Sequence, residues 1–519
     1  MYSSVQIHTR KPTPPNVQQT IYEPLLHDSP DSDRSVHHEG TTDDDDDDLK
    51  LGRFQGGRAT VFSSVSNLAN TILGTGMLAF PYAFASIGII PGIFSCAFSG
   101  SMAFFGLYLL SICAAKVEPP RSTSFNAISM LTFGKRATVF FDLAIAIKCF
   151  GVSISYLIII KTLTSTALTT LYTIISGSDE IPQILISHRL WLLLSMSINI
   201  PLAFFKKLDS LRFTSQAALV FVLYMLAIVI TYYFHRPHDI EPAGPVKYFK
   251  WSHGAIGTFP VQIFAYTCAQ NLFPVYNELK ENTQKRMNIV IGTSIGSATV
   301  IYEIIALAGY LTFGSKVKSN IVEMYSDSSL FVALGRLGIV LMVLFSYPLQ
   351  VHPCRAALDK VISTVWKDKE TLIQVPREEE EGDAQVVVPS LEMSKVRFIS
   401  LVSRPFLSSL VCLVNILNAD YRDSLTLCHS IIWKQTTGII LAGLAIALSV
   451  DHLETVLSFV GATGSTTISF ILPGLFYFSL FRHSKERSPV LTWAALGLAI
   501  YGICVMCFCL TYNIIQLLN

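Results

Sequence analysis

Small and polar residues interrupt two long apolar stretches of this chain, and each interruption could bind an anion. In the first, NLANTILGTGMLAFPYAF (Asn67–Phe84), Gly74 and Gly76 flank Thr75, and Pro81 follows. Glycine weakens a helix, and proline removes an amide donor. An unwound helix frees backbone N–H groups, which favour an anion such as a carboxylate. The alternative is a close helix crossing, in which small residues only let two backbones approach.

The second interruption matches the first, five apolar segments further along the chain. It is QIFAYTCAQNLFPVYNEL (Gln262–Leu279), where polar residues stand in apolar surroundings and Phe273-Pro274 repeats the pair Phe80-Pro81. Two interrupted segments in equivalent positions of two halves are the best sequence indication of a transporter's midplane binding site. The pair therefore favours a binding site over helix packing alone.

The elements that must position these residues are membrane helices. Hydrophobic residues make up 51% of the 519 residues and charged residues only 14%, whereas a soluble chain carries about 25% charged residues. The backbone can cross lipid only as helices here, because an open strand edge would leave amides unpaired. Eleven apolar segments are long enough to cross the bilayer, at about 61–89, 92–115, 138–173, 189–205, 213–234, 256–278, 288–312, 330–354, 431–450, 456–480 and 489–515.

These segments predict an all-α membrane protein with eleven transmembrane helices. Two inverted five-helix repeats, about 58–235 and 252–481, would contain the broken helices 1 and 6, and an extra helix would follow at about 489–515. The predicted transporter domain covers 58–519 and includes a cytosolic loop at about 355–430. Residues 1–57 contain the acidic run Asp43–Asp48 and too little apolar surface to fold, so we expect a disordered cytosolic tail.

Basic residues in the short loops predict the orientation. With a cytosolic N-terminus, thirteen lysines and arginines fall in inner loops and six in outer loops, which places the C-terminus on the opposite, lumenal side. The inner set is Lys116, Arg121, Lys135, Arg136, Lys206, Lys207, Arg212, Lys280, Lys285, Arg286, Arg482, Lys485 and Arg487; the outer set is Arg189, Arg236, Lys247, Lys250, Lys316 and Lys318.

Several classes of function lack support in the sequence. The formal net charge of +1 gives no indication of nucleic-acid binding. No phosphate-binding GxxxxGK[ST] loop, HExxH or GxSxG motif occurs, so we expect neither an enzyme nor an ATP-driven pump. Cys504, Cys507 and Cys509 have no further ligand nearby, so we expect no metal site and no cofactor. Transport would draw on an ion gradient, with a proton or sodium as the coupling ion.

The first interruption also resembles a known signature. SNLANTILGTGMLAFPYA is similar to the first-span motif of the amino acid/auxin permease family, which includes sodium-coupled neutral amino acid transporters and fungal vacuolar amino acid transporters. The acidic tail and the SYPLQVHPCR ending of the eighth segment look closest to the vacuolar branch. Supporting motifs are CFGVSISYLIII (Cys149–Ile160), PVYNEL (Pro274–Leu279), GYLTFG (Gly309–Gly314) and FSYPLQVHPCR (Phe345–Arg355). The resemblance covers about 58–515 and implies a leucine-transporter-type fold.

The resemblance implies roles for individual residues. The backbone from Thr71 to Met77 would hold the substrate carboxylate, and Asn70 matches the family's cation-site asparagine. Ser346 lies near the hydroxyl that completes a cation site in sodium-coupled members, although it could equally bond its own preceding turn. Many relatives carry a histidine where this chain has Ala269, so that role does not transfer. The predicted substrate-binding residues are Thr71, Leu73, Gly74, Thr75, Gly76, Met77, Tyr266, Cys268 and Gln270; for the last three, ordinary packing is the close alternative.

Charged residues inside the segments are costly and therefore informative. Glu303 lies near the middle of the seventh segment and is either a proton carrier, since burial favours a protonated carboxylate, or the partner of a lysine elsewhere. Asp142, Lys148, Lys161 and Arg336 are predicted to lie nearer segment ends or to reach them, with structural pairing as their role. No charge is predicted beside either interruption, which favours neutral substrates.

These observations predict a secondary active amino acid transporter in the lipid bilayer. We expect proton-coupled export of neutral amino acids from a vacuolar or lysosomal lumen to the cytosol, with cytosolic regulators of the N-terminal tail as further partners. Two alternatives stay open: a sensor that binds an amino acid without moving it, and sodium-coupled uptake at the plasma membrane.

Overall fold

The structure, a computed structural model, describes residues 57–177, 180–204, 212–237, 243–250, 254–326, 328–373, 424–484 and 488–518. Within these ranges the chain is helical, and its backbone pairing of the β type is limited to one isolated bridge between Ala59 and Leu279. The predicted N-terminal tail, apart from Gly57, and most of the predicted loop 355–430 lie outside the described residues.

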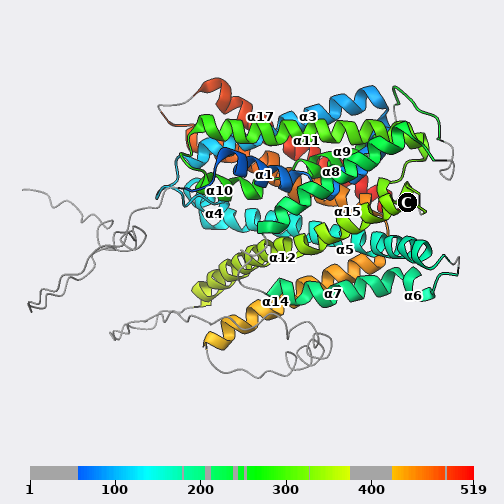
Figure 1. Cartoon of the computed structure of the whole chain (residues 1–519). Helices are drawn as coiled ribbons and strands as arrows, with labels where there is room; N and C mark the ends of the chain where they lie inside the picture. Colours follow the sequence, from blue (N-terminus) through cyan, green and yellow to red (C-terminus); the bar gives the residue numbers. More distant parts are fainter. Residues whose placement is uncertain are drawn as a thin grey trace, which may run out of the picture. The chain divides into compact units, whose positions relative to one another are not determined.

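Helices occupy all eleven predicted segments (Figure 1). They are α1 Val61–Ile72, η2 Thr75–Ala79, α2 Phe80–Ile87, α3 Ile89–Ala114, α4 Phe125–Thr132, α5 Gly134–Ser176, α6 Gln183–Ile186, α7 His188–Phe204, α8 Arg212–Phe234, α9 Gly254–Ala265, α10 Ala269–Glu278, α11 Gln284–Phe313, η4 Gly314–Lys316, η5 Ile321–Met324, α12 Leu330–Ile373, α14 Ser424–Ser449, α15 Leu453–Val460, η7 Gly461–Ser465, η8 Thr467–Ile471, α16 Leu472–Phe481 and α17 Pro489–Leu518.

Length and composition identify fewer membrane crossings than there are predicted helical segments. Within the described residues, six helices are long and apolar enough to cross a membrane. A seventh crossing follows if Val61–Ile72 and Thr75–Ile87, which are bent by 46° at a short break, count as one span. The break falls where the first interruption was predicted. The count of eleven crossings and the inverted repeat remain predictions.

Two groups of helices position the interruptions. α5 and α12 pack along each other, with α7 and α14 beside them in the lower half of Figure 1. α11 packs against α1 and α2, while α9 packs against η2 and α2. Aromatic rings fill the space between these elements: Tyr302 stacks on Phe80 with ring centroids 4.5 Å apart and meets Tyr266 edge-on at 5.3 Å. The two broken segments therefore share one buried core.

The tenth segment is wound more widely than an α-helix, which its apolar sequence pattern does not indicate. η7 and η8 are π-helical and join α15 to α16. Their glycines let other backbones approach: a Cβ at Gly461 would overlap the carbonyl of Pro260, and one at Gly464 would lie 2.7 Å from the Cβ of Lys148. π-Helical turns are frequent at functional sites. Here they bring this segment against both α9 and α5.

Candidate functional site

The two interruptions lie next to each other, and hydrogen bonds from side chains connect them. The hydroxyl of Tyr302 on α11 donates to the carbonyl of Ile72 at 2.5 Å and to that of Ala265 at 3.1 Å. Each carbonyl lies at the end of the helix that precedes a break. Asn271 Nδ2 in turn donates to Thr71 Oγ1 at 2.6 Å. Carbonyls freed at helix ends need such partners, so these contacts hold the two breaks in register.

A small cavity of about 30 Å³ lies between the two breaks. Its walls come from both interrupted segments together with α5 and α12, which is the arrangement expected for a binding site at the centre of a transporter. The lining residues are Thr71, Ile72, Gly74, Thr75, Gly76, Lys148, Val152, Tyr156, Phe264, Ala265, Thr267, Gln270 and Gln350.

The chemistry of this cavity suits an anionic group. Gly74 N–H donates locally to Ile72 O at 2.7 Å, whereas Thr75 and Gly76 begin η2, where the first amides of a helix have no partner within it. The start of a helix favours negative charge. Among the described residues, Gln270 Oε1 and Gln350 Oε1 are buried without a hydrogen-bond partner. The cavity therefore offers free donors on one wall and unsatisfied acceptors on others.

Five of the nine predicted substrate-binding residues line this cavity: Thr71, Gly74, Thr75, Gly76 and Gln270. The other four do not.

Leu73 and Met77 are buried in the apolar core, and Cys268 is fully buried at the N-cap of α10. Tyr266 donates to Thr299 Oγ1 at 2.9 Å and lies 3.2 Å from Cys96 Sγ, so its hydroxyl is directed at α3 and α11. For these four residues, packing is the role that the contacts describe.

The three predicted coupling residues lie outside the cavity lining. Asn70 is half-buried in the last turn of α1, and Ser346 is half-buried in α12. Glu303 is half-buried on α11, and among the described residues no ion pair reaches it. The lysine partner considered for Glu303 is thus not found there, and it is the neighbouring Tyr302 that contacts the breaks.

Lys148 corrects two predictions. It is only 3% exposed and lines the cavity beside Gly74 and Gln270, so it neither reaches a segment end nor leaves the interruptions free of charge. Sequence reasoning missed this because it could not tell which face of the third segment points inward. The signal that could have found it is its depth, well inside the segment 138–173.

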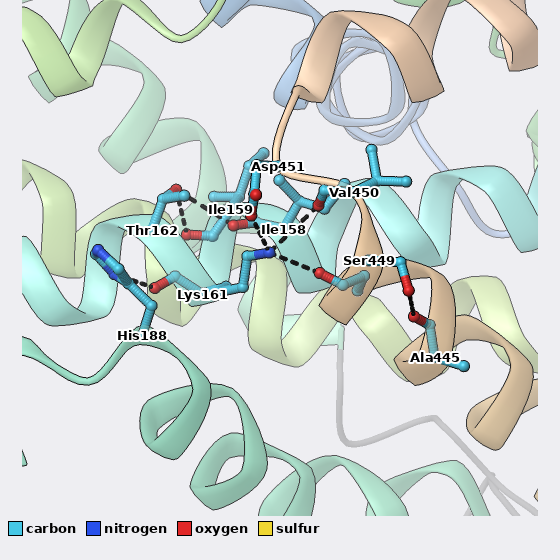
Figure 2. A network of polar contacts seen from close by, with 10 residues as sticks. Ile158, Ile159, Lys161, Thr162, His188, Ala445, Ser449, Val450 and Asp451 are labelled. Carbon is cyan, nitrogen blue, oxygen red and sulfur yellow. Dashed lines mark hydrogen bonds and ion pairs between the residues drawn. The ribbon is translucent and has the colours of Figure 1, made fainter. Parts of the chain in front are cut away.

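The predicted structural pairing is confirmed for Lys161, which forms an ion pair. Arg336 instead donates hydrogen bonds to backbone carbonyls. Lys161 Nζ lies 2.7 Å from Asp451 Oδ1 and donates to the carbonyl of Val450 (Figure 2). It also donates to the carbonyl of Ala447. Arg336 is fully buried and donates to the carbonyls of Val322 and Tyr325. Both residues therefore satisfy loop and helix-end groups.

The Lys161–Asp451 pair lies in the wall of a second, larger cavity of about 840 Å³. This cavity opens among the loops before α7, before α12 and between α14 and α15, on the side predicted to be lumenal. Charged and histidine side chains line it: Lys161, His188, Arg189, Lys318, Glu323, Asp451, His452 and Glu454. The hydrogen bond and charge of Lys161 hold the pKa of the Asp451 carboxyl below its ordinary value of 3.8.

Replacing Asp451 with alanine is expected to lower stability by about 1 kcal/mol, because 79% of the Asp451 side chain is exposed and water screens the pair. A lowered pKa gives stability that is complete above pH 3.8 and is lost as the pH falls through the folded-state value. The difference in Tm between wild type and Asp451→Ala should thus be constant from pH 7 to pH 5 and shrink only below about pH 4. Glu281→Ala, which removes an exposed pair with Arg286, is the control and should change Tm less. A difference that already disappears at pH 5 would contradict this account.

At the opposite end of the bundle, the chain entering α1 is bound to the end of α10. Ala59 N donates to Glu278 O, and Lys280 N donates to Ala59 O, both at 2.9 Å. Arg121 Nη1 donates to the carbonyls of Asn277 at 2.8 Å and Leu279 at 3.0 Å. Hydrogen bonds between the two broken segments thus close this end of the bundle, while the larger cavity opens at the other end.

The fold and the site define a helical membrane transporter with two interrupted helices around a central cavity. The chain belongs to the transmembrane amino acid transporter protein family, whose model matches residues 57–518. This confirms the family resemblance and shows that the protein is an amino acid transporter and not an enzyme.

Curated relatives match nearly the whole chain. "Vacuolar amino acid transporter 5" of Schizosaccharomyces pombe is 36% identical over 482 residues, which are 89% of this chain and 96% of that protein. "Vacuolar amino acid transporter 6" of Saccharomyces cerevisiae is 32% identical over 477 residues, 87% of this chain and 98% of that protein. The structure "Inward facing conformation of Mhp1" shares the fold, with a TM-score of 0.50 over 89% of this chain and 90% of that chain at 13% identity.

Proposed function

We propose that this protein exports amino acids from the vacuole lumen to the cytosol and that proton movement in the same direction drives the export. The observation that carries the proposal is the cavity between two paired breaks, where free amides can hold the α-carboxylate. The vacuolar membrane as its location is supported by the similarity to vacuolar amino acid transporters. A cytosolic N-terminus and a lumenal C-terminus belong to the same proposal.

Alternating access requires a site that opens to one side at a time. The two ends of the bundle differ in a way that supports such a cycle. The larger cavity opens at the end with the Lys161–Asp451 pair, and hydrogen bonds between Ala59 and Glu278 close the other end. The small cavity lies at the breaks of segments that run between these two ends. Separation of the Ala59–Glu278 bonds would open the cavity to the cytosol. Rearrangement at one end with closure at the other is the usual structural route for such transporters.

Neutral amino acids are the proposed substrates, although the reason differs from that given by the sequence. Lys148 places a basic group at the cavity, and among the described lining residues there is no carboxylate that could neutralise a cationic side chain. Cationic amino acids are therefore disfavoured. An anionic side chain is the alternative that the same lysine would accommodate.

The test is transport by the purified full-length protein in liposomes. Labelled leucine, glutamine, histidine, lysine and glutamate are each offered from the acidic side of an imposed pH gradient, with either sodium or choline present. We expect leucine or glutamine to accumulate on the neutral side, equally in both salts. Binding without any flux would make the protein a sensor, and accumulation that requires sodium would restore Asn70 and Ser346 as a sodium site.

A further inference from the structure

Lys148 is a buried lysine without a counter-ion in the described part of the chain. Its side chain is 3% exposed, and no hydrogen bond or ion pair connects it to a described residue. Lys161, on the same helix, has a carboxylate and two carbonyls as partners. An isolated ammonium in a protein interior is costly unless an anion is paired with it. In the empty site Lys148 therefore lacks a counter-ion, and a bound anion would supply one.

The position of Lys148 makes the substrate carboxylate the natural anion. The side chain lines the same cavity as Gly74, Thr75 and Gly76, whose unwound backbone is the proposed carboxylate site. Close packing against Gly464 in η7 restricts the start of its stem, since a Cβ at Gly464 would lie 2.7 Å from that of Lys148.

Among the residues that the structure describes, no carboxylate lies in the cavity lining beside Lys148. The titratable groups that face it are the thiols of Cys149 on α5 and Cys268 at the second break, and the phenol of Tyr156 in the same cavity wall. η7 contributes Gly464 and α12 contributes Gln350, which are uncharged. Glu303, one of the three coupling residues predicted from the sequence, is not in the lining. Lys148 is the basic group of this cavity.

We propose that Lys148 is the proton-binding residue of the transport cycle. In the site open to the lumen, the Nζ lone pair takes a proton from lumenal water as the amino acid enters, and the ammonium pairs with the substrate carboxylate. When the site opens to the cytosol and the amino acid leaves, one Nζ–H bond breaks and the proton passes to cytosolic water. One proton then accompanies each amino acid, because each stabilises the other in the site.

The proposal rests on the proposed function, and two assays separate them. Counterflow at equal pH exchanges labelled for unlabelled amino acid and needs no net proton movement, so it reports transport alone. Accumulation driven by a pH gradient reports coupling. The probe is whichever of leucine, glutamine, histidine, lysine and glutamate gives the highest counterflow with wild type. Absence of wild-type counterflow would refute the proposed function; counterflow without gradient-driven accumulation would refute only the coupling.

Lys148→Met is expected to lower gradient-driven accumulation at least about tenfold and to weaken amino acid binding, because its ammonium pairs with the carboxylate. The counterflow that remains at a raised amino acid concentration should no longer depend on pH. Lys161→Met removes the same ammonium from the same helix but away from the central cavity, and it should retain both activities. Glu303→Gln should also retain both. Undiminished accumulation by Lys148→Met overturns the proposal. Residual counterflow with the same pH dependence as wild type also overturns it, because Lys148 would then be a binding residue only.

A measurement on wild type keeps the proposal testable if Lys148→Met does not fold. Addition of the probe amino acid to the detergent-solubilised full-length protein in weak buffer should take up about one proton for each amino acid bound. A pH indicator dye records the uptake and a binding isotherm records the occupancy. Saturable binding without proton uptake would overturn the role of Lys148.

Discussion

Replacing Gly74 with leucine is expected to abolish amino acid flux and to leave the bundle folded. Gly74 has φ −115° and ψ −152°, an extended conformation that any residue adopts, and a Cβ there meets only the carbonyl of Ile72 at 3.9 Å. The added side chain would occupy the cavity of about 30 Å³ and cover the amides that follow. Counterflow should fall at least about 100-fold, as expected when a bound group is displaced, while Tm stays near that of wild type.

The matched control for this substitution is Gly296→Leu. Gly296 lies on α11, which packs against α1, and a Cβ there meets no atom within 4 Å. This variant should transport as wild type does, because the new side chain faces away from the site. Normal flux in Gly74→Leu would show that the first break serves helix packing and that the substrate binds elsewhere.

Replacing Gly76 with alanine is expected to destabilise the protein, by about 1–3 kcal/mol, as overpacking of a core usually does. A Cβ at Gly76 would lie 2.7 Å from Ala265 Cβ and 2.9 Å from Ala265 Cα, so two backbones at the breaks would have to separate. Gly76 is therefore required by packing, and leucine at this position would disturb folding as well as transport. Thermal unfolding in detergent measures the effect.

Gly74→Ala is the control for Gly76→Ala, because it adds the same methyl group two residues away, into open space. We expect its Tm to be close to that of wild type. Equal unfolding temperatures for Gly76→Ala and wild type would mean that the breaks are not in close contact. The two glycines thus represent the two explanations considered for the interruption, a binding surface at Gly74 and a helix crossing at Gly76.

Local features of the chain were enough to predict the helical segments and the breaks. The length of an apolar stretch decides whether it can cross lipid, and such stretches can only be helical there. Gly74, Gly76 and Pro81 act on their own backbone, so the break between Ile72 and Thr75 was predictable. For the same reason Thr71, Gly74, Thr75 and Gly76 could be expected at one place, and with Gln270 from the second break they line one cavity. Their role in substrate binding stays a prediction.

Contacts between distant segments required the tertiary structure. Glu303 and Tyr302 are adjacent in sequence, but side chains one position apart leave a helix in different directions, and only Tyr302 reaches Ile72 and Ala265. The third segment is apolar on all sides, so its hydrophobic pattern does not reveal that Lys148 points at the cavity. Which face of a buried helix meets which neighbour depends on how the whole bundle packs, and that is a property of the folded chain and not of any one segment.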